Sequence, residues 1–265
     1  MPTPLPPDQR RKVLLTGAAG AIGRCVAPAL VARGHDVRGF DRLPCPGLAD
    51  HVVGDLADAD DVDRAAAGRD TLVHLAAYPD PAPFVDTLLG PNVAGLYRVV
   101  DTALRHGLSR LVLASSIQVV SGARRRETQR TITARDAAPV NDYALTKLWA
   151  EQLGAMAARN HPGVSVVAAR IGWFVRNLGE ARRILDSGRA TGVYFSHDDA
   201  RRFFAAAVEN DLPPHPDNFA TVYAVGPGDG EHPSPYDLGP GRELLGYLPQ
   251  DVFPQGLADD IADAL

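Results

Sequence analysis

Tyr143 and Lys147 are the two side chains with the clearest potential for chemistry in this sequence. They lie four residues apart in a segment expected to be helical, so both project from one face of that helix. A phenol has a pKa of about 10, too high for a base at neutral pH, but a neighbouring ammonium lowers that pKa. The pair therefore predicts that Tyr143 takes a proton from a substrate hydroxyl.

The rarity of lysine supports this interpretation over the alternative, a chance pair on a solvated helix. Only two of the 27 Lys and Arg residues are lysines, Lys12 and Lys147. A lysine retained at position 147 indicates a need for a compact ammonium donor, which a guanidinium does not provide.

The segment Thr16 to Gly23 predicts a binding site for a nicotinamide dinucleotide. It follows a short apolar run and opens a helix. Gly17 permits a tight turn, Gly20 lets the backbone approach a pyrophosphate, and Gly23 allows the helix to pack closely on the strand. The pyrophosphate charge would meet the free N–H groups at the start of the helix. The alternative is a purely structural turn.

Two acidic residues extend this site. Asp41 ends the next apolar run, where its carboxylate would accept hydrogen bonds from ribose hydroxyls and repel a 2′-phosphate. NAD is therefore favoured over NADP, although Arg42 could hold a phosphate. Asp55 follows another strand end, where the adenine would rest, and otherwise it is a surface loop acid.

Apolar runs of strand length alternate with helical segments, which predicts a doubly wound parallel α/β sheet with a Rossmann fold and a small C-terminal substrate lid. The expected strands are 13–15, 36–40, a run ending at 53, 71–77, 110–115, 164–171 and 221–225. The expected helices are 21–33, 60–67, 84–106 with a break near Gly90-Pro91, 142–160, 179–187, 197–209 and 241–245. Residues 117–141 are expected to form a long polar loop.

The chain is expected to divide into a flexible leader (1–11), an NAD-binding Rossmann domain (12–172) and a small substrate-binding region (173–265) interleaved with the same sheet. The proline-rich leader has no apolar segment of the kind found in signal peptides. No run approaches the length of a membrane span.

Composition excludes several classes of partner. With 265 residues and a formal net charge of -5, nothing in the composition suggests nucleic acid or an anionic membrane as a partner. Its two cysteines lack metal-ligand spacing and favour a reducing cytoplasm. No metal-binding cluster and no Ser-His-Asp hydrolase pattern is present.

The ordered motifs resemble those of the extended short-chain dehydrogenase/reductase family, also called the epimerase/dehydratase family. These motifs are Gly17-x-x-Gly20-x-x-Gly23, Asp55-Leu56, His74-Leu75-Ala76-Ala77, Asn92, Ser115-Ser116, Tyr143-x-x-x-Lys147 and Leu245-Gly246-Tyr247-Leu248-Pro249. The resemblance covers nearly the whole chain. It implies dinucleotide contacts at Gly17, Ala19, Gly20, Ala21, Ile22, Gly23, Asp41, Arg42, Asp55, Leu56, Leu75, Ala76, Ala77, Asn92, Ser115, Tyr143, Lys147 and Ile171.

The resemblance also implies a third catalytic group, a Ser or Thr that donates a hydrogen bond to the developing oxyanion. Many members carry it one residue after a Ser-Ser pair, where this chain has Ile117. Ser116 is the expected residue, because a related subgroup uses the second serine. The alternative is that both serines only cap the strand.

Four segments carry a finer resemblance: Leu72 to Leu75, Asn92 to Tyr97, Arg170 to Gly172 and Phe195 to Asp199. In these segments the sequence resembles the uronate dehydrogenases, which oxidise a hexuronic acid at C1. A hexuronate is therefore the first expectation, and a sugar or sugar acid the broader one. The substrate region departs from that group at Pro79, Ile117 and Gln118. The arginine that would bind the substrate carboxylate corresponds to Arg183 or Arg176.

Two other functions remain open at this point: a sugar epimerase that returns the hydride, and a catalytically silent NAD-binding regulator. Relatives often dimerise through the helices that carry Asn92 and Tyr143. A homodimer or higher homo-oligomer is therefore expected.

Overall fold

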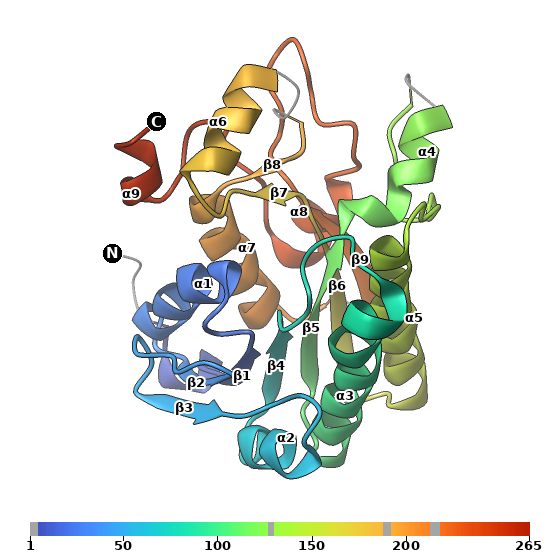
Figure 1. The fold of residues 1–265 in the computed structure, drawn as a ribbon. Coiled ribbons are helices and arrows are strands. Elements are labelled where there is room, and N and C mark those ends of the chain that lie inside the picture. Colours follow the sequence, from blue (N-terminus) through green and yellow to red (C-terminus); the bar gives the residue numbers. More distant parts are fainter. Residues whose placement is uncertain (1–4, 127–129, 188–191, 213–217) are drawn as a thin grey trace.

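The computed structural model describes residues 5–126, 130–187, 192–212 and 218–265, and it is built around a seven-stranded parallel sheet (Figure 1). The strand order is β3-β2-β1-β4-β5-β6-β9. The bounds are β1 Lys12–Thr16, β2 Asp36–Asp41, β3 Asp50–Val53, β4 Thr71–His74, β5 Arg110–Ser116, β6 Ser165–Ile171 and β9 Phe219–Ala224. The chain crosses over between β3 and β4, so the two halves of the sheet wind in opposite directions. The predicted doubly wound α/β fold is confirmed.

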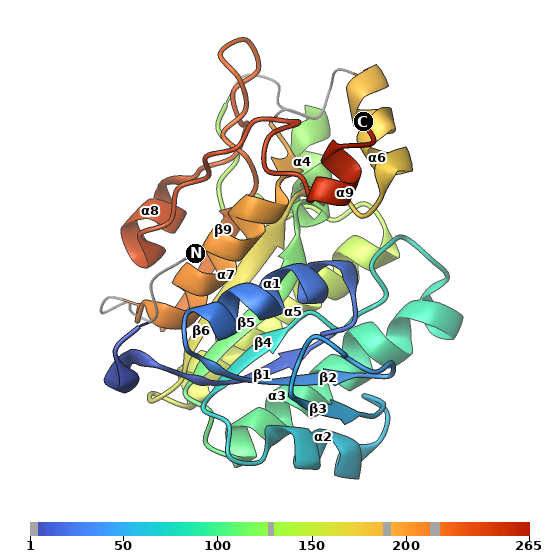
Figure 2. The same ribbon diagram turned by 90° about the vertical axis from the view of Figure 1, so that its left-hand side faces the viewer.

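Helices cover both faces of the sheet because the strands alternate apolar side chains between the two faces. Val13 and Leu15 of β1 join a core under helices α1 (Ala21–Ala32) and α7 (His197–Glu209). Leu14 faces the opposite core. Figure 2 shows α1 in front of the sheet with α7 beside it.

The opposite core lies under α2 (Ala59–Ala66), α3 (Leu96–Arg105) and α5 (Asp142–Asn160). In Figure 1, α3 and α5 lie side by side along the sheet. Apolar burial on both faces is the main favourable term for folding, at about 25 cal/mol per Å².

Three expected elements differ from the observed ones. Strand β4 ends at His74 and not at Ala77, because the chain must pass over the first glycine turn there. The helix expected to break near Gly90-Pro91 continues: a π-helix (Phe84–Gly95) leads directly into α3. Its wider turn accommodates Pro91, whose ring would clash with a carbonyl in an α-helix.

The third difference concerns the segment expected to be a polar loop. It contains a 3-10 helix (Ile117–Val120) and α4 (Ser121–Arg126). Further on, Ile132 forms a β-bridge to Tyr236. Buried apolar residues such as Val120 hold this segment against the C-terminal part of the chain.

The region after Gly172 supplies β9 to the main sheet and builds a third core beside it. Besides α7, its other elements are β7 (Trp173–Phe174), α6 (Leu178–Ser187), β8 (Tyr194–Phe195), α8 (Gly239–Leu245) and α9 (Asp259–Ala262). Val175, Ile184, Tyr194 and Ile261 belong to this third core. Figure 1 shows α4, α6 and β8 gathered at one end of the sheet.

A buried polar network ties the central strands to α5. Glu151 of α5 accepts hydrogen bonds from Arg170 of β6 at both carboxylate oxygens, each at 2.8 Å, and from Ser115 of β5 at 2.6 Å. Arg170 also donates to the Tyr223 hydroxyl of β9 at 3.0 Å. Glu151 and Arg170 are 3% and 1% exposed, so neither charge is compensated by water. Loss of one partner of such a pair typically costs about 3–5 kcal/mol.

The described part of the predicted leader makes defined contacts. Pro7–Gln9 forms a 3-10 turn, Leu5 N donates to Arg33 O at 2.9 Å, and Arg11 pairs with Asp211 at 2.7 Å. Residues 1–4 lie outside the described part. Among the helices of the described ranges, none combines the length and apolarity that a membrane crossing requires.

The first glycine turn brings two backbone segments into close approach. Gly17 has φ of +72°, and its N donates to Phe40 O at 2.8 Å. A Cβ at this position would lie 2.7 Å from Ala76 N and 2.8 Å from Leu75 C. Both atoms are backbone, so they cannot move aside without displacing the loop after β4.

We therefore expect Gly17→Ala to destabilise the fold more than Gly107→Ala. Gly107 has a similar φ of +74°, but a Cβ there has no neighbour within 4 Å. Gly107→Ala should cost only the left-handed penalty of about 1–2 kcal/mol. Gly17→Ala should add steric strain of at least about 1 kcal/mol. The free energies of unfolding in urea measure both, and equal losses would contradict the close approach.

Candidate active site

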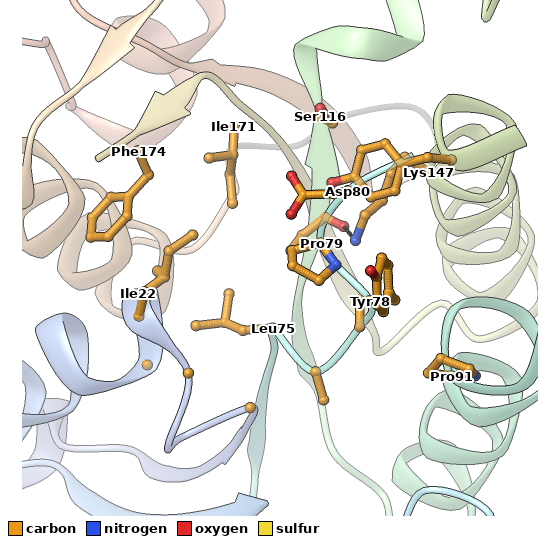
Figure 3. A pocket seen from close by; sticks show the side chains of 18 of the residues that line it. Ile22, Leu75, Tyr78, Pro79, Asp80, Pro91, Ser116, Lys147, Ile171 and Phe174 are labelled. Carbon is orange, nitrogen blue, oxygen red and sulfur yellow. Dashed lines mark hydrogen bonds between the residues drawn. The ribbon is translucent and has the colours of Figure 1, made fainter. Parts of the chain in front are cut away.

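A pocket of about 1010 Å³ opens at the carboxyl ends of the central strands, where ligands bind in doubly wound sheets. Residues of β2, β5, α5 and β6, of the start of α1, and of the segments that follow β1 and β4 meet in it, with further residues from the C-terminal region (Figure 3). The predicted site residues that line the pocket are Gly17, Gly20, Ala21, Ile22, Gly23, Asp41, Arg42, Asp55, Leu56, Leu75, Ala76, Ala77, Pro79, Ser115, Ser116, Ile117, Gln118, Tyr143, Lys147, Ile171, Arg176 and Arg183. Two predicted residues, Ala19 and Asn92, lie outside this lining.

The glycine turn has the shape that a dinucleotide pyrophosphate requires. Gly20 is the N-cap of α1, and no side chain caps the first turn, so its N–H groups remain available to an anion. A Cβ on Gly23 would lie 2.2 Å from Gly17 O, so only glycine allows α1 to start this close to β1. The residues present fit the predicted cofactor.

Asp41 also holds the glycine turn in place. Its Oδ2 accepts from Ala19 N at 3.1 Å, and its Oδ1 accepts from Leu43 N at 3.1 Å. Ala19 therefore takes part through its backbone, away from the pocket lining. The carboxylate keeps free lone pairs for ribose hydroxyls. Arg42 is exposed at the pocket edge next to it.

Asp55 is bound within its own loop. Its Oδ1 accepts from Ala57 N at 2.8 Å, and its backbone N donates to Asp61 at 3.0 Å. Its neighbour Leu56 is buried and lines the pocket beside it. Asp55 therefore stabilises its own loop and also lines the pocket.

Tyr143, Lys147 and Ser116 meet at the end of β5. Asn141 caps α5 by accepting from Ala144 N at 2.8 Å, which fixes where the helix begins. The Lys147 Nζ lies 5.6 Å from the Tyr143 ring centroid and donates to Ala114 O at 3.1 Å. The Ser116 side chain lies close enough to the Tyr143 phenol to lower its pKa. All three side chains are buried at 7% exposure.

Burial dominates the electrostatics of this group. It raises the pKa of Tyr143 to about 12, against the lowering effect of the Ser116 hydrogen bond. It lowers the pKa of Lys147 to about 8. The pKa of Tyr143 thus lies above its usual value, because desolvation of the phenolate outweighs the lowering effects of Ser116 and Arg176. A positive charge bound in the pocket would act in the opposite direction.

His74 is a buried residue at the end of β4, next to the pocket. Burial, followed by the charge of Lys147, lowers its pKa to about 3, so the imidazole is neutral. Its Nδ1 lies 2.8 Å from the Thr16 hydroxyl, which also accepts from Ala76 N at 3.4 Å. The neutral ring links the end of β4 to the glycine turn.

Asn92 positions two other elements. Its Oδ1 accepts from Tyr78 N at 2.7 Å, and its Nδ2 donates to Tyr78 O at 3.1 Å and to the Thr146 hydroxyl at 3.2 Å. Thr146 in turn donates to Tyr143 O at 2.8 Å. Asn92 thus fixes the loop after β4 relative to α5.

The expected substrate region is a mixture of apolar and charged side chains. Pro79 and Ile117 present apolar surface, and the Gln118 Oε1 accepts from Asn141 at 3.0 Å. Arg176 donates to two carboxylates, Asp80 and Glu180. Arg183 lies 3.8 Å from Glu180 and is 68% exposed.

Several lining residues were not predicted to belong to the site: Tyr78, Asp80, Asp86, Thr87, Gly90, Pro91, Trp173, Phe174, Glu180 and Val193. Asp80 carried a usable signal, because it closely follows a buried strand end. The residues from the C-terminal region carried none, since only the fold brings them to this edge of the sheet. Within the described ranges, no three His, Cys, Asp or Glu side chains are arranged to hold a metal ion.

Curated relatives agree with this architecture. The chain is 32% identical over 257 residues to the L-arabinose 1-dehydrogenase (NAD(P)(+)) of Haloferax volcanii, covering 91% of this chain and 96% of that protein. It is 33% identical over 201 residues to the uronate dehydrogenase of Pseudomonas syringae pv. tomato, covering 74% of this chain and 69% of that protein.

Solved structures and family profiles give the same result. The uronate dehydrogenase of Agrobacterium tumefaciens superposes with a TM-score of 0.75 at 26% identity, covering 92% of this chain and 85% of that chain. The profile of the NAD dependent epimerase/dehydratase family matches residues 13–192. With the glycine turn and the Tyr143–Lys147 helix at the same pocket, the chain belongs to the NAD-dependent epimerase/dehydratase family.

Proposed function

We propose that this protein is a cytoplasmic NAD-dependent dehydrogenase that oxidises a hydroxyl of a sugar or sugar acid. The observation that carries the proposal is the meeting of Tyr143, Ser116 and Lys147 in the same pocket as the glycine turn. The relatives named as arabinose and uronate dehydrogenases support the substrate class. Two free, buried cysteines fit a reducing compartment.

The proposed reaction removes a hydride from carbon and a proton from oxygen. The Ser116 hydroxyl and the Tyr143 phenol would hydrogen-bond the reacting hydroxyl, and Tyr143 would accept its proton. NAD⁺, when bound, supplies the hydride acceptor and the positive charge that the buried phenol lacks. Lys147 would hold the ribose and add its ammonium charge.

Asp41 would set the preference for NAD over NADP. Its carboxylate can accept ribose hydroxyls while repelling a 2′-phosphate. Arg42 next to it offers a phosphate some compensation. We therefore propose that NAD is favoured and NADP is used more weakly.

The C-terminal region would serve as the substrate lid. Trp173, Arg176 and Val193 bring residues from beyond β6 into the pocket lining. Trp173 and Val193 pack on the third core, while the neighbouring Phe174 packs in the core that includes Ala18 of the glycine turn. This arrangement would let the dinucleotide and the sugar occupy opposite ends of one pocket.

A homodimer is proposed from an exposed apolar face on two neighbouring helical segments. Leu145, Trp149 and Met156 of α5 are between 41% and 51% exposed. Val85 of the π-helix and Tyr97 of α3 add 71% and 52% exposed side chains. Exposed apolar side chains clustered on packed helices mark interaction surfaces.

Replacing Tyr143 by Phe tests the proposed base. We expect kcat for a sugar substrate to fall by about 10²–10⁴-fold, because the proton acceptor is lost. The Kd for NAD should stay within a few-fold. Tyr97→Phe is the matched control and should leave kcat unchanged. An unaltered kcat in Tyr143→Phe would refute the mechanism.

Replacing Asp41 by Asn tests the cofactor preference. The amide keeps an oxygen acceptor for Ala19 N but removes the charge that repels a 2′-phosphate. The ratio of kcat/KM for NADP to that for NAD should rise at least about tenfold, equivalent to about 1.4 kcal/mol. Asp55→Asn should change the ratio little. If both cofactors respond equally to Asp41→Asn, the carboxylate does not discriminate between them.

Replacing Trp149 by Glu tests the dimer. A charge in the apolar face should reduce the mass measured by light scattering from two chains to one. Leu185→Glu is the control, because Leu185 is 57% exposed on α6, outside this face. A wild-type protein that is already monomeric would refute the dimer.

A further inference from the structure

Arg176 lies between two carboxylates at the substrate end of the pocket. Its Nε donates to Glu180 Oε1 at 2.8 Å, and its Nη1 donates to Asp80 Oδ2 at 2.7 Å. Its Nη2 lies 2.6 Å from Glu180 Oε1 and 3.3 Å from Asp80 Oδ1. All three guanidinium nitrogens are therefore engaged by carboxylate oxygens of this chain.

Glu180 is the fixed member of this triad. Its side chain is only 3% exposed, and its Oε2 also accepts from the backbone N of Arg176 at 2.9 Å. The N-terminal turn of α6 holds it further, since Glu180 N donates to Asn177 at 3.0 Å. Glu180 and Arg176 thus form an ion pair that does not require Asp80.

Asp80 adds a second negative charge to a pair that is already neutral. The triad has one cation and two anions, so its net charge is -1 when all three groups are ionised. Asp80 is 50% exposed, and Figure 3 shows its carboxylate directed into the pocket. The charge of Asp80 raises the pKa of Tyr143, and that of Arg176 lowers it. The triad therefore lies close enough to the proposed base to influence a substrate held there.

We propose that Asp80 occupies the position at which Arg176 would otherwise bind a substrate carboxylate, and that the pocket selects uncharged sugars and rejects uronates. The inference rests on the proposed dehydrogenase function. A substrate carboxylate approaching Arg176 would have to displace Asp80 or meet the net negative charge. The hydroxyls of a neutral sugar can donate hydrogen bonds to Asp80 without this cost.

Arg42 lies beside Asp41 at the cofactor end, and the two other arginines of the lining do not replace Arg176 either. Arg183 is 68% exposed and turned towards Glu180 at 3.8 Å, so water screens its charge. Arg124 donates to the Tyr236 hydroxyl at 3.1 Å and lies over that ring, 5.7 Å from its centroid. Neither forms a buried cationic site for a carboxylate.

Matched sugar pairs test the selection directly. D-Galactose and D-galacturonate differ only at C6, as do D-glucose and D-glucuronate. In NADH production by the wild-type protein, we expect kcat/KM for the better aldose to exceed that of its uronate by at least about tenfold. An equal or higher value for the uronate would overturn this inference and leave the dehydrogenase function intact.

Asp80→Asn tests the residue itself. The amide keeps the size of the side chain but removes one negative charge and frees part of Arg176. The uronate-to-aldose ratio of kcat/KM should rise at least about tenfold. Asp86→Asn removes a carboxylate that lines the same pocket and should alter the ratio by less than about twofold. An unchanged ratio in Asp80→Asn, or an equal rise in Asp86→Asn, would overturn the role of Asp80.

A binding measurement separates this inference from the proposed function. Titration calorimetry with Tyr143→Phe and saturating NAD⁺ measures sugar affinity without turnover. We expect the aldose to bind more tightly than its uronate, and Asp80→Asn in the same background to narrow the difference. If a panel of aldoses and uronates gives neither binding nor NADH, the dehydrogenase proposal fails. If uronates bind more tightly than their aldoses, only the charge selection fails.

Discussion

The buried ion pair between Glu151 and Arg170 is the interaction on which the geometry of the pocket depends. It joins α5 to β6, and through Ser115 and Tyr223 it also holds β5 and β9. α5 carries Tyr143 and Lys147, while β5 ends in Ser116, which lies beside the tyrosine. Apolar contacts are not directional, so alone they would not fix the position of a helix along the sheet. Two buried charges with fixed hydrogen-bond directions define one register.

The same low-dielectric surroundings shape the ionisation of the proposed catalytic groups. Burial raises the pKa of Tyr143 to about 12 and lowers that of Lys147 to about 8, so both groups favour their uncharged forms more than they would in water. Added positive charge next to the phenol shifts this balance towards the phenolate. In the proposed reaction, the oxidised dinucleotide would supply such a charge.

Charge pairing also explains why the sequence suggested more about the cofactor than about the substrate. The cofactor end is built from backbone, so the glycines and the position of Asp41 were enough to predict it. The substrate end is built from charged side chains that pair with one another across the fold. Arg176 follows β7 and Asp80 follows β4, and no spacing in the chain indicates that they meet. An arginine expected to be available for a ligand is bound to two internal carboxylates.

The sequence by itself determined the parallel sheet, the glycine turn and the helix that carries Tyr143 and Lys147. Each of these depends on local patterns: alternating apolar runs, a glycine where φ is positive, and a spacing of one helical turn. Only the tertiary structure decided that β4 ends at His74, that the helix around Pro91 continues as a π-helix, and that Asn92 supports the loop after β4. It also decided the charge of the substrate end. These features depend on which backbones approach one another and which charges become neighbours, and both are set by packing between distant segments.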